Sequence, residues 1–205
     1  MTEHPKFAAA DHDVHELIRR RWSPRAFDAA RPVPRAELMR LFEAARWAPS
    51  SFNEQPWRFL VIGRDESPGP WRALMDTLTA RNQAWAAAAP VLVLAAVKTT
   101  YDQNGAVNQM SWYDAGQAVA FLSLQATSQG LSLRQMEGFD REAARAALRV
   151  PAGFEPAVVM AVGYAGDPES LAFEKHREAE RRPRQRRALG EIVMFAGEES
   201  AEGAE

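Results

Sequence analysis

The sequence predicts one domain over residues 13–196, an α+β or α/β sandwich in which helices flank a central sheet. Short apolar runs without alternation, such as residues 91–97, are typical of strands covered on both faces. Segments with apolar residues at helical spacing lie between these runs. A length of 205 residues without an internal repeat or a clear linker fits a single domain.

The first half of the chain is predicted to begin with a flexible arm at residues 1–12 and then to alternate between helices and strands. Ser23-Pro24 ends the first helix, and Pro34 and Pro49 bracket the second. Gly63 closes the first strand, and Pro90 precedes the second. The predicted elements are helices at 13–22 and 34–48, a strand at 57–62, helical turns at 71–88 and a strand at 91–97.

The second half begins with a polar loop at 98–111 that is long enough to be functional. The helix predicted next, at 112–129, is apolar around most of its circumference, which indicates burial. The acidic tail at 197–205 is expected to be disordered. The remaining predicted elements are strands at 131–136, 157–162 and 192–195, and helices at 140–148 and, in part, 174–187.

Composition and charge argue against several classes of partner. The net charge is -2 with 46% hydrophobic residues, so no global field attracts nucleic acid or a membrane surface. The apolar run at 84–97 is interrupted by Pro90 and is shorter than the roughly 20 residues that span a bilayer. The N-terminus lacks the apolar segment of a signal peptide. Any anion site must therefore be a local cluster of basic residues.

The sequence lacks most protein-borne redox and nucleophilic groups. It has no cysteine, which fits a reducing cytoplasm and removes thiolate and iron–sulfur chemistry. His12 and His15 are three residues apart, but solvated histidines are the favoured interpretation and no metal site is predicted. No Gly-x-Gly-x-x-Gly, phosphate-binding loop or nucleophile elbow is present. An enzyme with this sequence is therefore expected to use a bound cofactor.

Two polar segments are candidate contacts for a phosphorylated cofactor. Arg19–Arg25 combines arginine forks with the hydroxyl of Ser23, and both groups can donate hydrogen bonds to phosphate. A solvated basic helix end is the alternative. Pro49–Trp57 places polar side chains between a helix and a buried strand, where they can bind the edge of a polar heterocycle. An ordinary turn segment is the alternative there.

A third candidate is the arginine cluster Arg184–Arg187 near the C-terminus. It could close on the same phosphate, and a solvated helix is the alternative. A nucleic-acid patch is disfavoured because no aromatic residues are interleaved and the acidic tail offsets the charge.

Taken in order, five parts of this sequence resemble the nitroreductase family. Residues 44–57, AARWAPSSFNEQPW, resemble the most specific motif of that family. The resemblance covers about residues 14–195. The other matching parts are Arg21-x-Ser23-x-Arg25-x-Phe27, Asn82–Trp85 with Ala89–Val91, Gly130–Asp140, and Gly163-Tyr164 with Arg184–Val193.

The resemblance implies a homodimer with a mostly antiparallel central sheet in each subunit and FMN at the subunit interface. The arginines and Ser23 would hold the phosphate and ribityl chain, and Asn82 would contact polar groups of the flavin. Residues 136–138 would line the ring edge, and residues 49–53 would reach the partner's flavin. The implied FMN contacts are Arg21, Trp22, Ser23, Arg25, Pro49, Ser50, Ser51, Asn53, Asn82, Met136, Glu137, Gly138, Arg184 and Arg186.

The implied function is an FMN-dependent oxidoreductase that transfers hydride from NADH or NADPH to a small electrophile, a nitroaromatic or a quinone, by a ping-pong mechanism. The protein would orient both molecules and tune the flavin, and no side chain need act as a nucleophile, so no catalytic residue is assigned.

Departures from the family pattern leave the acceptor open. Residues 99–111 are short for a lid, which suggests an open pocket. Trp112-Tyr113 and Ser132-Leu133-Arg134 stand where some relatives carry histidines. The alternatives are a reductase of an activated alkene or halogenated aromatic, a flavin-binding storage or sensor module, and a plain interaction domain.

Overall fold

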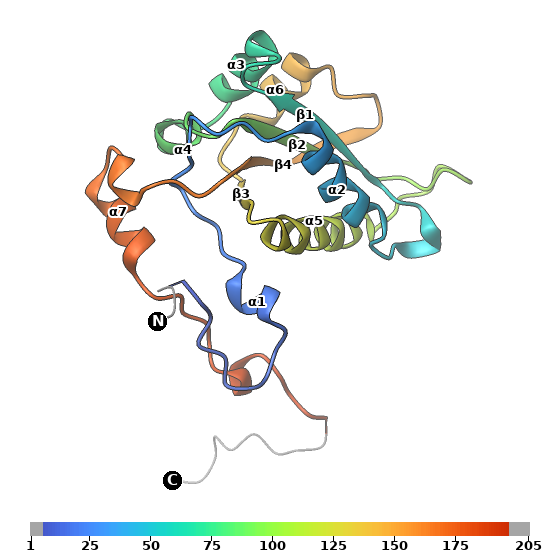
Figure 1. Ribbon diagram of the computed structural model, residues 1–205. Helices are drawn as coiled ribbons and strands as arrows, with labels where there is room; N and C mark the ends of the chain where they lie inside the picture. Colours follow the sequence, from blue (N-terminus) through green and yellow to red (C-terminus); the bar gives the residue numbers. More distant parts are fainter. Residues whose placement is uncertain (1–5, 197–205) are drawn as a thin grey trace.

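The computed structural model describes residues 6–196 and contains one four-stranded antiparallel sheet with the order β1-β2-β4-β3 (Figure 1). The predicted α+β sandwich is confirmed. The acidic tail at 197–205 and the first five residues of the predicted N-terminal arm lie outside the described residues. The strands are β1 (Trp57–Gly63), β2 (Val91–Lys98), β3 (Ser132–Met136) and β4 (Phe154–Gly163).

Strand β2 is buried on both faces, as its unbroken apolar sequence predicts. Leu92 and Leu94 face one hydrophobic core, whereas Val91 and Val93 face the other. Each such side chain contributes about 1.5–3 kcal/mol when fully buried. The first core is covered by α3 (Pro68–Asp76), α4 (Ala80–Ala86) and α6 (Arg141–Leu148), and the second by α2 (Arg35–Arg46) and α5 (Ser111–Ser128) (Figure 1).

Several elements differ in extent from the prediction. The first helix shortens to α1 (Glu16–Arg20), where the Nδ1 atom of His15 accepts a hydrogen bond from Leu17 N at 3.2 Å. The helical turns predicted at 71–88 are divided between α3 and α4. The charged segment predicted to be partly helical contains α7 (Glu174–Arg181). Three short 3-10 turns complete the fold: η1 (Ser51–Asn53), η2 (Pro168–Ser170) and η3 (Leu189–Glu191).

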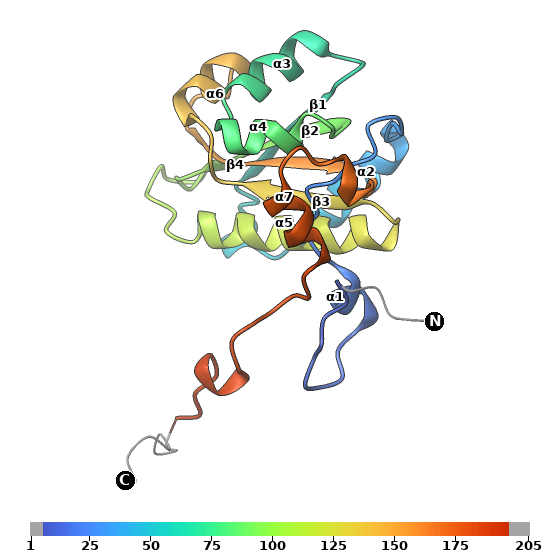
Figure 2. The ribbon, with the colours of Figure 1, turned by 90° about the vertical axis from the view of Figure 1, so that its left-hand side faces the viewer.

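The last strand predicted, at 192–195, is wrong. An apolar run becomes a strand only when a sheet edge lies beside it, and this segment lies in an arm that extends away from the body of the subunit (Figures 1 and 2). Its four apolar side chains, Ile192, Val193, Met194 and Phe195, are exposed instead.

Helix α5 also differs from its prediction, because only one of its faces is buried. Trp112, Tyr113 and Phe121 on the other face are 49%, 65% and 41% exposed. Gly116 and Ala120 lie on the same face and are exposed as well. The apolar circumference of α5 therefore exceeds what one subunit covers.

The segment that follows α1 is held against the end of the sheet. Phe27 forms an isolated antiparallel bridge with Ala165 just beyond β4. A side chain at Gly166 would place its Cβ 2.6 Å from the backbone of Phe27, so only glycine permits this approach. This contact fixes residues 21–27 beside the sheet. Within residues 6–196, no helix has both the length and the apolar character needed to cross a bilayer.

Candidate functional site

A basic pocket opens between the N-terminal segment, β3 and the C-terminal end of α7. It contains six of the residues predicted to contact a cofactor, and it adds four that were not predicted. Its lining consists of Lys6, Arg21, Trp22, Ser23, Arg25, Arg134, Ala179, Glu180, Arg184 and Arg186.

One side of the basic pocket is organised by Arg184. This side chain donates hydrogen bonds to the carbonyl oxygens of Arg19 and Arg21, and it thereby ties the segment after α7 to the end of α1. Arg21 in turn donates from Nη1 to Ser23 Oγ at 3.1 Å. The Nε atom of Arg184 is buried and has no hydrogen-bond partner among residues 6–196. A buried donor without a partner is costly, so a ligand acceptor fits here.

The opposite side of the basic pocket is organised by Glu180. Its side chain is 1% exposed and accepts a hydrogen bond from Arg25 N at 3.1 Å. Its second oxygen lies 3.7 Å from Arg25 Nη1. The carboxylate thus fixes both the backbone and the side chain of Arg25.

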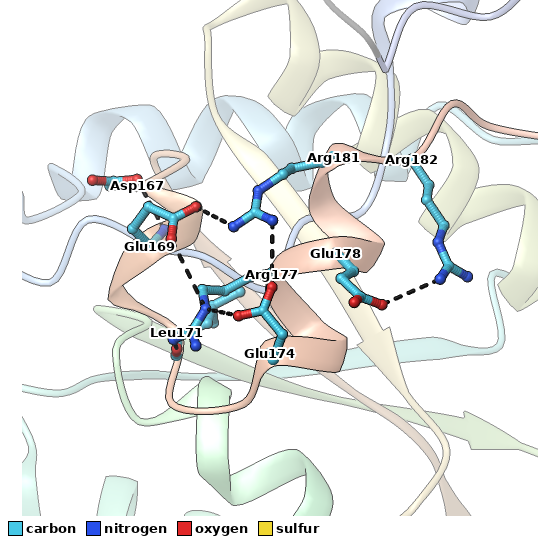
Figure 3. A network of polar contacts seen from close by, with 8 residues as sticks. All are labelled: Asp167, Glu169, Leu171, Glu174, Arg177, Glu178, Arg181 and Arg182. Carbon is cyan, nitrogen blue, oxygen red and sulfur yellow. Dashed lines mark hydrogen bonds and ion pairs between the residues drawn. The ribbon is translucent and has the colours of Figure 1, made fainter.

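An outward-facing network of ion pairs holds α7 in place (Figure 3). Arg181 bridges Glu169 of η2 and Glu174 of α7, and Arg177 donates to Glu174 at 2.8 Å and to Leu171 O at 2.6 Å. Isolated surface ion pairs contribute little, but a connected set restricts the orientation of a short helix. The outer face of α7 therefore anchors the helix while the inner face presents Glu180.

Arg134 reaches the basic pocket from β3. Its Nη1 atom donates to Ser23 O, and its guanidinium lies 5.3 Å from the centre of the Trp85 ring. Burial, together with Arg25 and against the effect of Glu180, lowers the pKa of Arg134 to about 10. A cation in this position is poorly solvated and would be stabilised by an anionic ligand.

Positive charge dominates the basic pocket. Burial and then Arg186 lower the pKa of Arg21, and burial, Arg21 and Arg186 lower the pKa of Arg184. Glu180 is the one carboxylate in the lining. The six cationic side chains are Lys6, Arg21, Arg25, Arg134, Arg184 and Arg186. Such an arrangement can bind a phosphate through several charge-assisted hydrogen bonds.

A second group of predicted residues lies beside the basic pocket. Asn82 of α4 donates from Nδ2 to Gly138 O at 3.1 Å, and a Cβ at Gly138 would lie 3.1 Å from Nδ2 of Asn82. Met136 ends β3 on the face that also carries Arg134, and Glu137 is exposed next to it. The structure therefore brings Asn82, Met136, Glu137 and Gly138 to the neighbourhood of Arg134.

The third predicted group, Pro49, Ser50, Ser51 and Asn53, lies elsewhere. Ser51 N donates to Asp114 Oδ2 at 3.0 Å in the first turn of α5, and Ser50 Oγ accepts from Gln55 N at 3.0 Å. Phe52, Asn53 and Gln55 have positive φ values of 52°, 57° and 49°, which is strained for side-chain-bearing residues. We call residues 49–55 the η1 loop.

Helix α5 separates the η1 loop from the basic pocket. The loop contacts the first turn of α5, whereas Trp22 lines a neighbouring hollow with Thr127 and Gly130 at the other end. The 18 residues of α5 span roughly 27 Å. Within one subunit the four predicted residues of the η1 loop therefore do not join the others.

Sequence reasoning missed Lys6, Arg134 and Glu180. Lys6 donates hydrogen bonds to the carbonyl oxygens of Ala179 and Arg182, and no local sequence pattern predicts these contacts. Glu180 lies in a charge run that is typical of a solvated helix. Arg134 offered a usable signal, because it precedes the predicted ring-edge segment on the same strand. Within residues 6–196, no group of three or more metal-binding side chains was found.

Comparisons with known proteins place this geometry in context. Residues 18–80 and 67–164 match the model of the nitroreductase family. An uncharacterised 15.4 kDa protein of Mycolicibacterium smegmatis is 40% identical over 146 residues, which are 68% of this chain and 95% of that protein. An NADH dehydrogenase of Thermus thermophilus is 29% identical over 178 residues, covering 71% of this chain and 82% of that protein.

A solved structure described as an oxidoreductase containing FMN is also similar. Its TM-score is 0.86 at 30% identity, and the match covers 98% of this chain and 100% of that one. The likeness therefore extends over the basic pocket, α5 and the η1 loop.

Proposed function

Because this chain belongs to the nitroreductase family, we propose that it is an NAD(P)H-dependent flavin oxidoreductase that binds FMN in the basic pocket and passes hydride to a small electrophile, a nitroaromatic or a quinone. The observation that carries the proposal is the crowding of six cationic side chains around one carboxylate, which an anionic group would relieve.

The residues present fit FMN in two respects. The buried Nε donor of Arg184 has no described partner and would gain a phosphate oxygen. The absence of a side chain at Gly138 lets Asn82 pack against the ring-edge segment, where a Cβ would lie only 3.1 Å from its amide nitrogen. A polar ring beside β3 would therefore meet the Asn82 amide, with its phosphate at the arginines.

In this proposal, Arg21, Ser23, Arg184 and Arg186 hold the phosphate, and Asn82 with residues 136–138 positions the ring edge. FMN would supply the hydride-transfer chemistry. The protein contributes binding, orientation and fixed positive charge. No side chain serves as a nucleophile, so the reductant and the acceptor can use one site in turn, as a ping-pong mechanism requires.

The separation of the η1 loop from the basic pocket supports a homodimer, because two subunits could bring the predicted FMN contacts together. The exposed face of α5 carries Tyr113 and Phe121 around the small residues Gly116 and Ala120, a surface on which a second helix can pack closely. A second subunit on this face would bring its own η1 loop to the basic pocket of the first. Pro49, Ser50, Ser51 and Asn53 would then contact the FMN of the partner, and the exposed apolar arm at 192–195 would gain a surface to cover it.

The test uses the purified full-length protein. We expect flavin absorbance, or uptake of added FMN, bleaching of that absorbance by NADH or NADPH without oxygen, and recovery on addition of a nitroarene or quinone. Bleaching without recovery by any electrophile, including activated alkenes and halogenated aromatics, would indicate a storage or sensor module. A protein that cannot take up FMN would contradict the proposal. The cytoplasmic location expected from the cysteine-free sequence stays a prediction.

Arg25→Ala tests the pocket directly. Loss of a charge-assisted contact should weaken FMN binding by about 1.5–3 kcal/mol. Titration of the flavin-free variant with FMN measures the effect, and an unchanged dissociation constant would count against Arg25 as an FMN contact.

A further inference from the structure

Five of the six cations of the basic pocket, all except Lys6, form two groups. Arg21, Arg184 and Arg186 lie together on the phosphate side, where Arg184 donates to the carbonyl oxygen of Arg21. Arg25 and Arg134 lie on the other side, joined through Ser23-Pro24-Arg25 and the Arg134 hydrogen bond to Ser23 O. The pKa values agree with this division. Burial is the largest cause of the lowered pKa of Arg21 and of Arg134. The next cause is Arg186 for Arg21, and Arg25 for Arg134.

Arg134 lies toward the proposed ring position. It precedes Met136 by two residues on β3, so both side chains project from the same face of the sheet. Its guanidinium rests on Trp85, three residues beyond Asn82 in α4, and Asn82 is bonded to Gly138. Arg134 is therefore linked to the predicted ring edge in two ways, through Met136 on β3 and through Trp85 and Asn82 of α4.

The two cations on this side differ in how their charge is compensated. Glu180 lies 3.7 Å from Arg25 Nη1 and offsets the charge of that residue. Arg134 forms no ion pair within residues 6–196, and its one described hydrogen bond is to Ser23 O. A guanidinium has five N–H donors, so several remain for a ligand in the pocket that Arg134 lines.

We propose that Arg134 is a further FMN-contacting residue whose charge, which no ion pair within residues 6–196 neutralises, favours the reduced form of the bound flavin over the oxidised form. Hydride transfer from NADH or NADPH adds two electrons and one proton, so it makes the ring system more negative by one charge. A fixed cation in a partly buried site stabilises that added charge more than it stabilises the neutral ring. The inference rests on the proposed FMN site.

The experiment compares the dissociation constants of oxidised and reduced FMN, and the midpoint potential of the bound flavin, in the full-length protein. For Arg134→Gln, binding of reduced FMN should weaken about tenfold more than binding of oxidised FMN, which lowers the potential by about 30 mV. Arg134→Met should do the same while retaining a long side chain over Trp85. Arg134→Lys keeps the charge and should restore most of the potential.

Two matched controls separate charge at the ring from other effects. Arg186→Gln removes a phosphate-side cation, so both forms should bind more weakly by the same factor and the potential should not change. Arg141 lies 5.3 Å from the Phe139 ring, outside the basic pocket, and Arg141→Gln should leave both affinities unchanged.

The outcomes are distinguishable. An unchanged potential in Arg134→Gln or Arg134→Met would overturn the inference while leaving FMN binding intact. Equal potentials in Arg134→Lys and Arg134→Gln would also overturn it, because a purely structural role for the arginine would then suffice. If either neutral variant fails to fold, the other neutral variant and Arg134→Lys still decide the question. Failure of the unaltered protein to bind FMN would instead contradict the proposed function.

Discussion

The basic pocket and the η1 loop lie at opposite ends of α5 and are stabilised in opposite ways. In the basic pocket, the hydrogen bonds lie within one chain: the buried Glu180 accepts from Arg25 N, and Arg184 donates to Arg21 O. In the η1 loop, Phe52 is 80% exposed and adopts a left-handed backbone conformation. Strain of this kind persists where the surroundings impose it, often at functional sites. The pocket is fixed by contacts within the chain, whereas the loop is exposed and, in the proposed homodimer, would present its side chains to the second subunit.

The largest effect is expected from a substitution on the exposed face of α5. A Cβ added at Gly116 would meet no atom within 4 Å, so the Gly116→Arg subunit should fold normally. A bulky charge there should prevent close packing of a second helix, give a monomer by light scattering and reduce NADH-dependent turnover at least about 100-fold. Gly69→Arg in α3 is the matched control, since a Cβ there also meets no atom within 4 Å. A dimeric, active Gly116→Arg variant would refute the assignment of this face.

The next effect tests how the basic pocket is held. Glu180→Gln leaves Arg25 without its buried counter-charge and should lower the free energy of unfolding by about 3 kcal/mol in the absence of FMN. Urea denaturation measures this, and added FMN should reduce the loss. Glu178→Gln on the outer face of α7 (Figure 3) removes an exposed partner of Arg182 and should change stability by less than about 0.5 kcal/mol. Equal losses in both variants would show that burial of Glu180 is unimportant.

A smaller effect tests the η1 loop. Phe52→Gly relieves left-handed strain but gives the unfolded chain more freedom, so the free energy of unfolding should change by less than about 1 kcal/mol. Turnover should nevertheless fall about tenfold, because the exposed ring would contact the partner subunit. Arg149→Gly removes a side chain at a similar φ, 50° against 52° for Phe52, outside both regions. Its stability change should be similar and its turnover normal. Equal losses of turnover in Phe52→Gly and Arg149→Gly would contradict a role of the η1 loop in turnover.

The smallest effect concerns pH. His176 is 3% exposed, and burial followed by the charge of Arg25 lowers its pKa. The unfolded chain then binds a proton more readily than the folded one, so stability should fall as the pH drops below about 6.5. His176→Phe should flatten this dependence between about pH 7.5 and 5.5, measured by urea denaturation at each pH. An identical slope in the variant would assign the dependence to other groups.

The sequence predicted an element correctly where its local pattern is enough to determine the structure. The run at 91–97 became a strand because apolar side chains on both faces leave no other stable placement. Arg21 and Arg184 were predicted from the family pattern to share a site, and the structure brings them together although they are far apart in the chain.

The failures share a physical cause. The run at 192–195 has strand character, but one subunit offers it no edge. The apolar circumference of α5 indicated full burial, but Trp112, Tyr113 and Phe121 are exposed on one of its faces. Glu180 was hidden because a buried carboxylate in a charged helix has the same local pattern as a solvated one. Each error concerns what lies beside a segment in the folded structure, which the local sequence pattern does not determine.

The basic pocket also has a consequence for how the protein is made. Its contacts join Arg25 to Glu180 and Lys6 to Arg182, which are separated by 155 and 176 residues. Among residues 6–196, by contrast, the two hydrophobic cores contain no residue after Leu171, which precedes α7. During synthesis from the N-terminus, a sheet can therefore assemble before the pocket has its second half. FMN retention should therefore require synthesis of α7, and a chain that ends between Leu171 and α7 should be folded but colourless.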